Sequence, residues 1–201
     1  MRHLRLTIAL LVSLCVPALA NAALISASYQ VNLNNSDPGL VVDSADLEAN
    51  PFSFDLNEGD SVTFNLFKIW TPEGAVNDDD LAPQPIAVDF NFTSPGLMNG
   101  SVSGSTSGDT EVFGFFQEGV LNWGSPLQLA FGALGDGLLE ISLFDAEFNE
   151  GVLWGLGHHG AKVEARVKLI SEASEVPEPS ALALLGLGLL GMGMRARRRS
   201  A

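Results

Sequence analysis

Cysteine is nearly absent from this chain of 201 residues, in which Cys15 is the single one. Residues 23–201 therefore cannot form an internal disulfide bond, and a zinc site with cysteine ligands is excluded there. The stability of the folded part has to come from a packed hydrophobic core. The roughly 155 residues between the two terminal segments are enough for one domain.

Basic residues are scarce in the middle of the chain. Residues 23–176 contain four basic residues against 23 acidic ones, a formal charge of −19 compared with −14 for the whole chain. Nucleic acids and anionic membranes bind basic patches, so this imbalance argues against nucleic acid as a partner. It suits a soluble exported domain and permits association with divalent cations.

Catalytic signatures are missing as well. The chain has no Gly-x-Ser-x-Gly, HExxH or EF-hand spacing. A glycoside hydrolase needs two carboxylates about 5–10 Å apart, and the sequence does not single out a pair from its acidic residues. Those near the end of the domain are Glu140, Asp145, Glu147 and Glu150. We therefore expect a non-enzymatic protein without a cofactor, and keep a secreted glycan-active hydrolase as an alternative.

The first 22 residues have the pattern of a signal peptide. A short basic stretch, Met1–Arg5, precedes an apolar helix-forming stretch, Leu6–Val16, and small residues follow at Ala18, Ala20 and Ala22. We expect export and cleavage by signal peptidase after Ala22, with Ala20 as the less favoured position. Because Leu14 stands where a lipobox needs a small residue, Cys15 leaves with the signal peptide.

The other end of the chain has three parts. Pro177, Glu178 and Pro179 precede the apolar stretch Ala181–Met194, and a basic tail, 195–201, follows with Arg195, Arg197, Arg198 and Arg199. Fourteen apolar residues at 1.5 Å per residue span about 21 Å, so we expect a short transmembrane helix over 179–194 that Arg195 extends by snorkelling. The arginines stop the helix on the cytoplasmic side of the inner membrane. A buried core helix is the alternative, but this stretch has no polar face.

These three parts, in this order, resemble a PEP-CTERM sorting signal, which we place at 177–201. The resemblance implies that exosortase is a partner, that the chain is exported and transiently anchored in the inner membrane, and that it is cleaved near Pro177-Glu178-Pro179. It also implies delivery to the cell surface or extracellular matrix, in a setting of exopolysaccharide and biofilm. It covers about 25 residues and says nothing about the passenger domain.

The passenger, 23–170, reads as short β-strands, with a polar linker at 171–176. Apolar residues alternate with polar ones in several segments, and Gly/Pro-rich turns separate them. This predicts an all-β fold, an antiparallel β-sandwich in which a jelly-roll arrangement is possible. The phase reverses at Phe67–Ile69, which indicates a bulge. The expected strands are 24–31, 52–56, 61–66, 86–93, 111–117, 127–131, 139–143, 151–156 and 163–169.

Two segments read as loops. Ser101–Asp109 is nearly all Ser, Gly and Thr, and Thr71–Pro85 contains Asn77 followed by Asp78, Asp79 and Asp80. Ca²⁺ takes six to eight oxygen ligands, so these carboxylates are candidate ligands, although adjacent side chains do not all converge and a solvated acidic loop is the simpler interpretation.

Aromatic residues offer a candidate sugar-binding site. The available rings are those of Tyr29, Trp70, Trp123 and Trp154. Trp70 lies at a strand end beside the acidic loop, where exposure to a sugar is expected, whereas Trp123 and Trp154 can equally fill the core. A carbohydrate-binding module, with exopolysaccharide as ligand, is therefore the first alternative to a purely structural surface protein.

Overall fold

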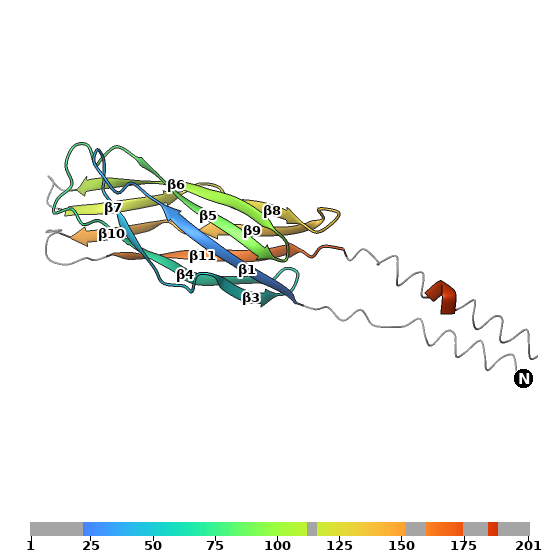
Figure 1. Cartoon of the computed structure of the whole chain (residues 1–201). Helices are drawn as coiled ribbons and strands as arrows, with labels where there is room; N and C mark the ends of the chain where they lie inside the picture. The colour runs from blue at the N-terminus through green and yellow to red at the C-terminus, as the bar shows by residue number, and fades with distance from the viewer. Residues whose placement is uncertain (1–21, 112–115, 152–159, 175–184, 189–201) are drawn as a thin grey trace, which may run out of the picture.

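The computed structural model describes residues 22–111, 116–151, 160–174 and 185–188. Its folded part is built from β-strands (Figure 1), so the all-β prediction is confirmed. The strands are β1 (Ala23–Asn32), β2 (Asp43–Asp46), β3 (Phe52–Leu56), β4 (Ser61–Trp70), β5 (Gln84–Ser94), β6 (Met98–Glu111), β7 (Phe116–Trp123), β8 (Leu127–Phe131), β9 (Gly137–Leu143), β10 (Ala146–Gly151) and β11 (Ala161–Ser171).

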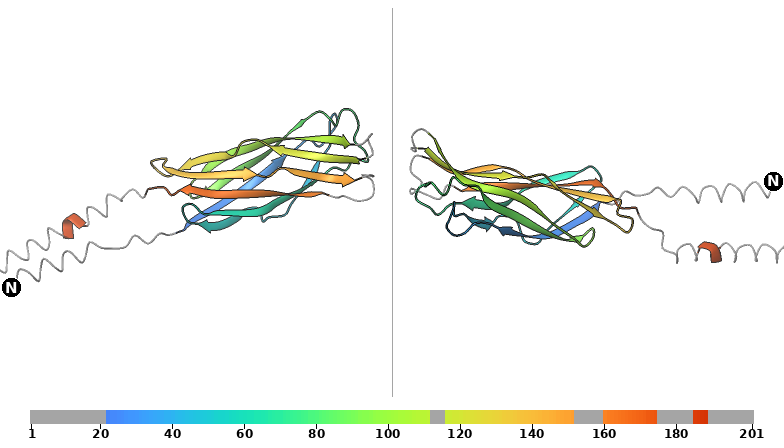
Figure 2. Two further views of the ribbon diagram at one scale, coloured as in Figure 1. Left: turned by 180° about the vertical axis from the view of Figure 1, so that it is seen from behind. Right: turned by 90° about the horizontal axis from the view of Figure 1, so that it is seen from above.

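The strands form two antiparallel sheets. The six-stranded sheet has the order β10-β7-β6-β5-β1-β3, and the five-stranded sheet has the order β2-β4-β11-β9-β8. Seen from behind and from above (Figure 2), the strands of both sheets run along the long axis of the domain. Only Phe144 and Asp145 separate β9 from β10, so the chain passes directly from one sheet to the other there.

One hydrophobic core lies between the sheets, and the alternation in the sequence explains it. On β5 the side chains of Ile86, Val88, Phe90 and Phe92 are buried, while residues between them face outward. β11 does the same with Val163, Ala165, Val167 and Leu169. Because successive side chains of a strand point to opposite faces, each sheet gives one apolar face to the core.

The predicted bulge is present in β4. Val163 pairs with Phe67 and Glu164 pairs with Asn65, so Leu66 is the extra residue on this strand. Leu66 and Phe67 are both fully buried, which is the local break in alternation that the sequence showed. A bulge adds one residue to one strand of an antiparallel pair and so reverses the phase after it.

The expectation of a loop at Ser101–Asp109 was wrong, because these residues lie within β6, between β5 and β7. Val102, Thr106 and Gly108 supply the buried positions, and Ser101 and Ser103 face outward. The strand expected at 111–117 straddles residues 112–115, outside the described residues, and the chain forms strands on either side of them. The strand expected at 151–156 falls mostly outside the described residues too.

We call the two ends of the domain proximal and distal, according to the segments that each contains. The proximal end contains the start of β1, the end of β11 and the turns 57–60, 95–97 and 132–136. The distal end contains the segments 33–42 and 71–83 (Figures 1 and 2). Ser94 Oγ donates to Leu24 O (2.6 Å), and Ser174 N–H donates to Asp136 Oδ2 (3.1 Å), so these proximal elements lie together.

The terminal helices expected over the signal peptide and over 179–194 lie outside the described residues, except for one helical turn at 185–188. In the part of the chain that the structure describes, no helix has the length and apolarity needed to cross a membrane.

Candidate functional site

Trp70, the predicted sugar contact, is the last residue of β4 and opens onto the distal end. Its side chain is partly buried, and Lys68 Nζ lies 6.0 Å from the centroid of its ring. A Cβ atom at Gly160 would lie 2.5 Å from Ile69 O and 3.1 Å from Trp70 Cβ, so only glycine fits beside this strand end. Lys68 thus places a positive charge beside the ring.

The other described aromatic candidates belong to the core. Tyr29 is buried, and its hydroxyl donates to Leu66 O (2.8 Å). Burial, together with the negative charge of Asp46, raises the pKa of Tyr29 well above its usual range. Trp123 packs against the core with its Nε1 buried and without a partner. Trp154 lies outside the described residues.

The acidic turn Asn77–Asp80 is held by its own side chains. Asn77 N–H donates to Asp80 Oδ2 (2.8 Å), and Asp79 N–H donates to Asn77 Oδ1 (3.0 Å). Asp79 Oδ2 accepts from Gly39 N–H (3.1 Å), while Asp78 is exposed. Among the described residues, no three acidic, histidine or cysteine side chains are grouped to hold a metal ion. The Ca²⁺ site at Asp78–Asp80 therefore stays a prediction.

Asn149 fastens the beginning of the 71–83 segment to β10. Its amide accepts from Thr71 N–H (3.3 Å) and donates to Thr71 O (3.0 Å), and both residues are buried. Asn149 has φ +57°, a left-handed conformation in which asparagine is several-fold enriched. The sequence contains no local signal for this clamp, since the two residues lie 78 positions apart.

Glu73, which the sequence did not single out, meets Asp80 inside this segment. Val41 N–H donates to Glu73 Oε1 (3.0 Å), while Glu73 Oε2 and Asp80 Oδ1 are both buried without a donor. Burial raises the pKa of Glu73, and the charge and hydrogen bonding of Asp80 raise it further, although the Val41 N–H lowers it. The fully buried Asp80 and the partly buried Glu73 are therefore neighbours in this segment.

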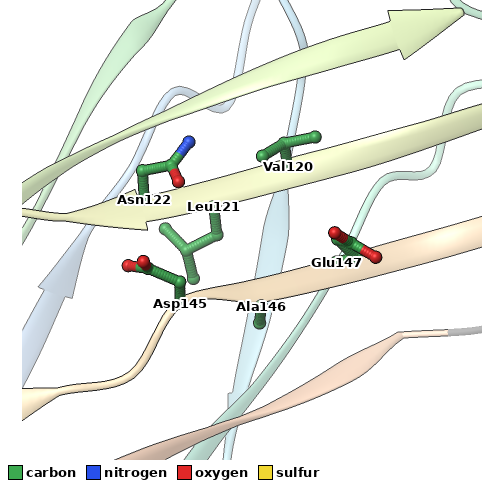
Figure 3. A pocket seen from close by; sticks show the side chains of 6 residues that line it. All are labelled: Val120, Leu121, Asn122, Asp145, Ala146 and Glu147. Carbon is green, nitrogen blue, oxygen red and sulfur yellow. The ribbon is translucent and has the colours of Figure 1, made fainter.

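A hollow of about 330 Å³ between β7 and β10 contains the carboxylates Asp145 and Glu147 (Figure 3). Both side chains are exposed, and Asp145 Oδ1 accepts from Trp123 N–H (2.6 Å). Asp145 is thus engaged in holding the end of β7. Its neighbours in the hollow are Val120, Leu121, Asn122 and Ala146.

A second hollow, of about 360 Å³, lies on the outer face of the six-stranded sheet. Gln30 pairs with Asp89, which pairs with Ser101, and Asn91 pairs with Asn99, so polar side chains from β1, β5 and β6 stand in neighbouring rows. The hollow combines amide, hydroxyl and carboxylate groups, which both donate and accept hydrogen bonds. Sequence reasoning missed it because the rows form only when the three strands pair.

The residues of the sorting signal, Pro177, Glu178 and Pro179, and the arginines 195, 197, 198 and 199 lie outside the described residues, as does Ala20. Ala22 is described and exposed, and β1 begins at the next residue. A cut after Ala22 would therefore leave this strand whole.

The class of the protein follows from a two-sheet antiparallel domain that is joined to a terminal sorting segment. Residues 175–199 match the family of the PEP-CTERM protein-sorting motif, which confirms the resemblance. The chain therefore carries a PEP-CTERM sorting motif, which implies exosortase as its processing partner and implies export with transient anchoring in the membrane before sorting. Neither a curated protein nor a solved structure matches the chain.

Proposed function

We propose that this chain is a non-enzymatic protein of the cell surface or extracellular matrix, associated with exopolysaccharide or biofilm. The observation that carries the proposal is the PEP-CTERM motif at residues 175–199, attached to a β domain. In this proposal the passenger is a β-sandwich without a cofactor, released from its signal peptide after Ala22. The exposed position of Ala22, directly before β1, supports that cleavage site.

The order of membrane anchoring and cleavage follows from the sequence at the carboxyl end. The 179–194 segment holds the exported chain in the inner membrane, the basic tail fixes its orientation, and exosortase cuts near Pro177-Glu178-Pro179. Mass spectrometry of the mature carboxyl terminus tests this order. A terminus close to residue 177 supports it, and a surface protein that retains Arg195–Arg199 contradicts it.

A carbohydrate-binding module is the second candidate function, and Trp70 favours it. Trp70 is the last residue of β4, which ends at the distal end of the domain, whereas β11 ends at the proximal end. Aromatic faces pack against the apolar face of sugar rings, and the polar hollow around Asn91 offers hydrogen bonds to hydroxyl groups.

Retention on purified polysaccharides tests the second candidate. We expect Trp70→Ala to weaken retention about tenfold, equivalent to roughly 1.4 kcal/mol, while Trp70→Phe keeps most of it. Asn91→Ala tests the polar hollow separately. If no polymer retains the wild-type protein, the binding-module function is rejected, while the sorting proposal stands.

A secreted hydrolase is the remaining alternative. Asp145 and Glu147 are the described acidic pair that shares a hollow. Turnover on a panel of glycans that disappears in both Asp145→Asn and Glu147→Gln would establish the hydrolase and overturn the non-enzymatic proposal.

A further inference from the structure

All four lysine and arginine residues of the passenger domain lie on one face of the molecule. Residues 23–176 contain only these four, against 23 acidic residues. Lys68 belongs to β4, whereas Lys162, Arg166 and Lys168 lie at alternating positions of β11. The intervening positions of β11 that are buried face the core, so the cations point outward from the five-stranded sheet. The pairing of Lys68 with Lys162 places both on this same face.

Two of these cations have partners within the domain. Lys168 stands opposite Glu140 of β9 in the strand register. The guanidinium carbon of Arg166 lies 4.9 Å from the centroid of the Phe144 ring, and Arg166 Nε donates to Thr63 Oγ1 (3.5 Å). The charges toward the proximal end of β11 are thus engaged by the sheet itself.

The other two cations, Lys68 and Lys162, stand directly opposite each other. On its other side Lys68 stands opposite Ala45 of β2, so the residues that flank it across the sheet include no acid. Like charges directly opposite each other in a sheet are destabilising. The fold therefore keeps two ammonium groups together at some cost in stability, and a bound anion would offset that cost.

Trp70 borders the same two lysines. It lies two residues beyond Lys68 on the same face of β4, and Lys68 Nζ is 6.0 Å from the centroid of its ring. A Cβ atom at Gly160 would lie 2.6 Å from Lys68 Cε, so the lack of a side chain at position 160 leaves room for the lysine stem. An aromatic ring and two ammonium groups thus adjoin at the distal end of the sheet.

We propose that Lys68, Lys162 and Trp70 form a subsite for a carboxylated sugar, so that the domain binds an acidic polysaccharide that contains uronic acids. The inference rests on the carbohydrate-binding candidate and names the class of its ligand. The sugar ring packs against the indole, and its carboxylate accepts charge-assisted hydrogen bonds from the two ammonium groups. A neutral sugar would leave the two like charges uncompensated.

Nearby acids limit where such a ligand can bind. Asp43 of β2 stands opposite Trp70, and Glu164 lies two residues beyond Lys162 on β11. At physiological ionic strength, exposed charges farther apart than about 8 Å are largely screened from each other. Ammonium groups in contact with the ligand therefore act on it more strongly than the acids spread over the domain. Those acids repel a polyanion from the other faces.

Retention on two forms of one polymer tests the subsite: polygalacturonate, and the same polymer after reduction of its carboxyl groups to alcohols. A chelator in the buffer removes any bridging by Ca²⁺. We expect the acidic form to retain the wild type about tenfold more strongly at low salt, and the difference to shrink as salt is added.

Lys162→Gln should weaken retention on the acidic form about fivefold, the size of one exposed ion pair, and leave retention on the reduced form unchanged. Lys168→Gln is the matched control, because it removes a lysine from the same strand and face. We expect it to leave retention on both forms unchanged. An equal loss in both variants would overturn the subsite, since the attraction would then belong to the whole face.

The melting temperature separates a binding role of the lysine pair from a structural one. Because Lys162→Gln removes the repulsion with Lys68, it should keep or slightly raise the melting temperature while it weakens retention. A lowered melting temperature would overturn the subsite, because the pair would then stabilise the fold. Equal retention of the wild type on both forms of the polymer rejects the acidic ligand and leaves the carbohydrate-binding candidate standing. Retention on neither form nor on any other polymer rejects both.

Discussion

The two ends of the domain are built in different ways. The proximal end is closed by short turns with glycines at positive φ, such as Gly59 (+86°) and Gly135 (+69°), around which a Cβ would meet nothing within 4 Å. The distal end is closed by the 33–42 and 71–83 segments, which are held by side-chain hydrogen bonds between distant positions, such as Val41 with Glu73 and Thr71 with Asn149. Thr71, Asp80 and Asn149 are its buried polar residues.

The two ends therefore separate the export and sorting of the chain from any function of the passenger domain. The proximal end contains the start of β1 and the end of β11, so the segment before β1 and the sorting motif both join the domain there. The distal end points away from the attachment and contains Trp70 and the Glu73–Asp80 pair. A binding function placed at the distal end would remain accessible while the chain is anchored.

The largest expected effect comes from the segment that follows the proximal end. Replacing Pro177, Glu178 and Pro179 together with alanine should abolish processing by exosortase, because the recognition element is removed. The full-length chain should then accumulate in the membrane fraction on immunoblots. The melting temperature of the domain should not change, and a lowered value would show that the sorting segment contributes to the stability of the domain.

Asn149→Ala should give the next largest effect, on the distal end alone. The substitution leaves Thr71 N–H and C=O buried without partners and places alanine at a positive φ, which together should lower the free energy of unfolding by about 2–3 kcal/mol. For a domain of this size that corresponds to a fall of roughly 4–12 °C in melting temperature by calorimetry. Asn149→Gly, which accepts the φ but lacks the amide, should recover only part of the loss. An unchanged melting temperature would contradict the clamp.

The smallest effect concerns Asp136 at the proximal end. Hydrogen bonds from Ser174 lower its pKa below the usual 3.8, although the group is exposed. Its contribution is therefore present above that pH and is lost as the pH falls through the folded pKa. In Asp136→Asn the acid-side decline of the melting temperature should become slightly shallower. An acid-side decline that is unchanged in Asp136→Asn would contradict the assignment.

The sequence predicted much of the β architecture and less of the candidate site. Alternation located β5 and β11, and its reversal at Phe67–Ile69 indicated the bulge of β4, because buried residues of one strand follow each other at a fixed period. It failed at Ser101–Asp109, where glycine and serine leave too little apolar signal to mark a strand. That segment becomes β6 through pairing with β5 and β7 on both sides.

Trp70 and the acidic turn were visible as residue types, but their partners were not. Only the structure drew attention to Glu73, because it accepts a hydrogen bond from Val41, 32 residues away, and lies near the buried side chain of Asp80. The sequence favoured Asp78, Asp79 and Asp80 as a group because they are adjacent. Adjacency on a turn sends side chains in different directions, and only Asp80 points into the protein.

By itself the sequence determined which sorting signal this protein carries. It also determined that the passenger domain is made of β-strands. Sorting enzymes read continuous segments, and alternation is a local property, so both are written along the chain. Tertiary structure alone decided which strands pair, which end faces away from the attachment point, and which charged side chains lie together. These features depend on contacts between residues that are far apart in the sequence. The burial of a charged group is likewise set by the whole fold, because distant segments together exclude water from it.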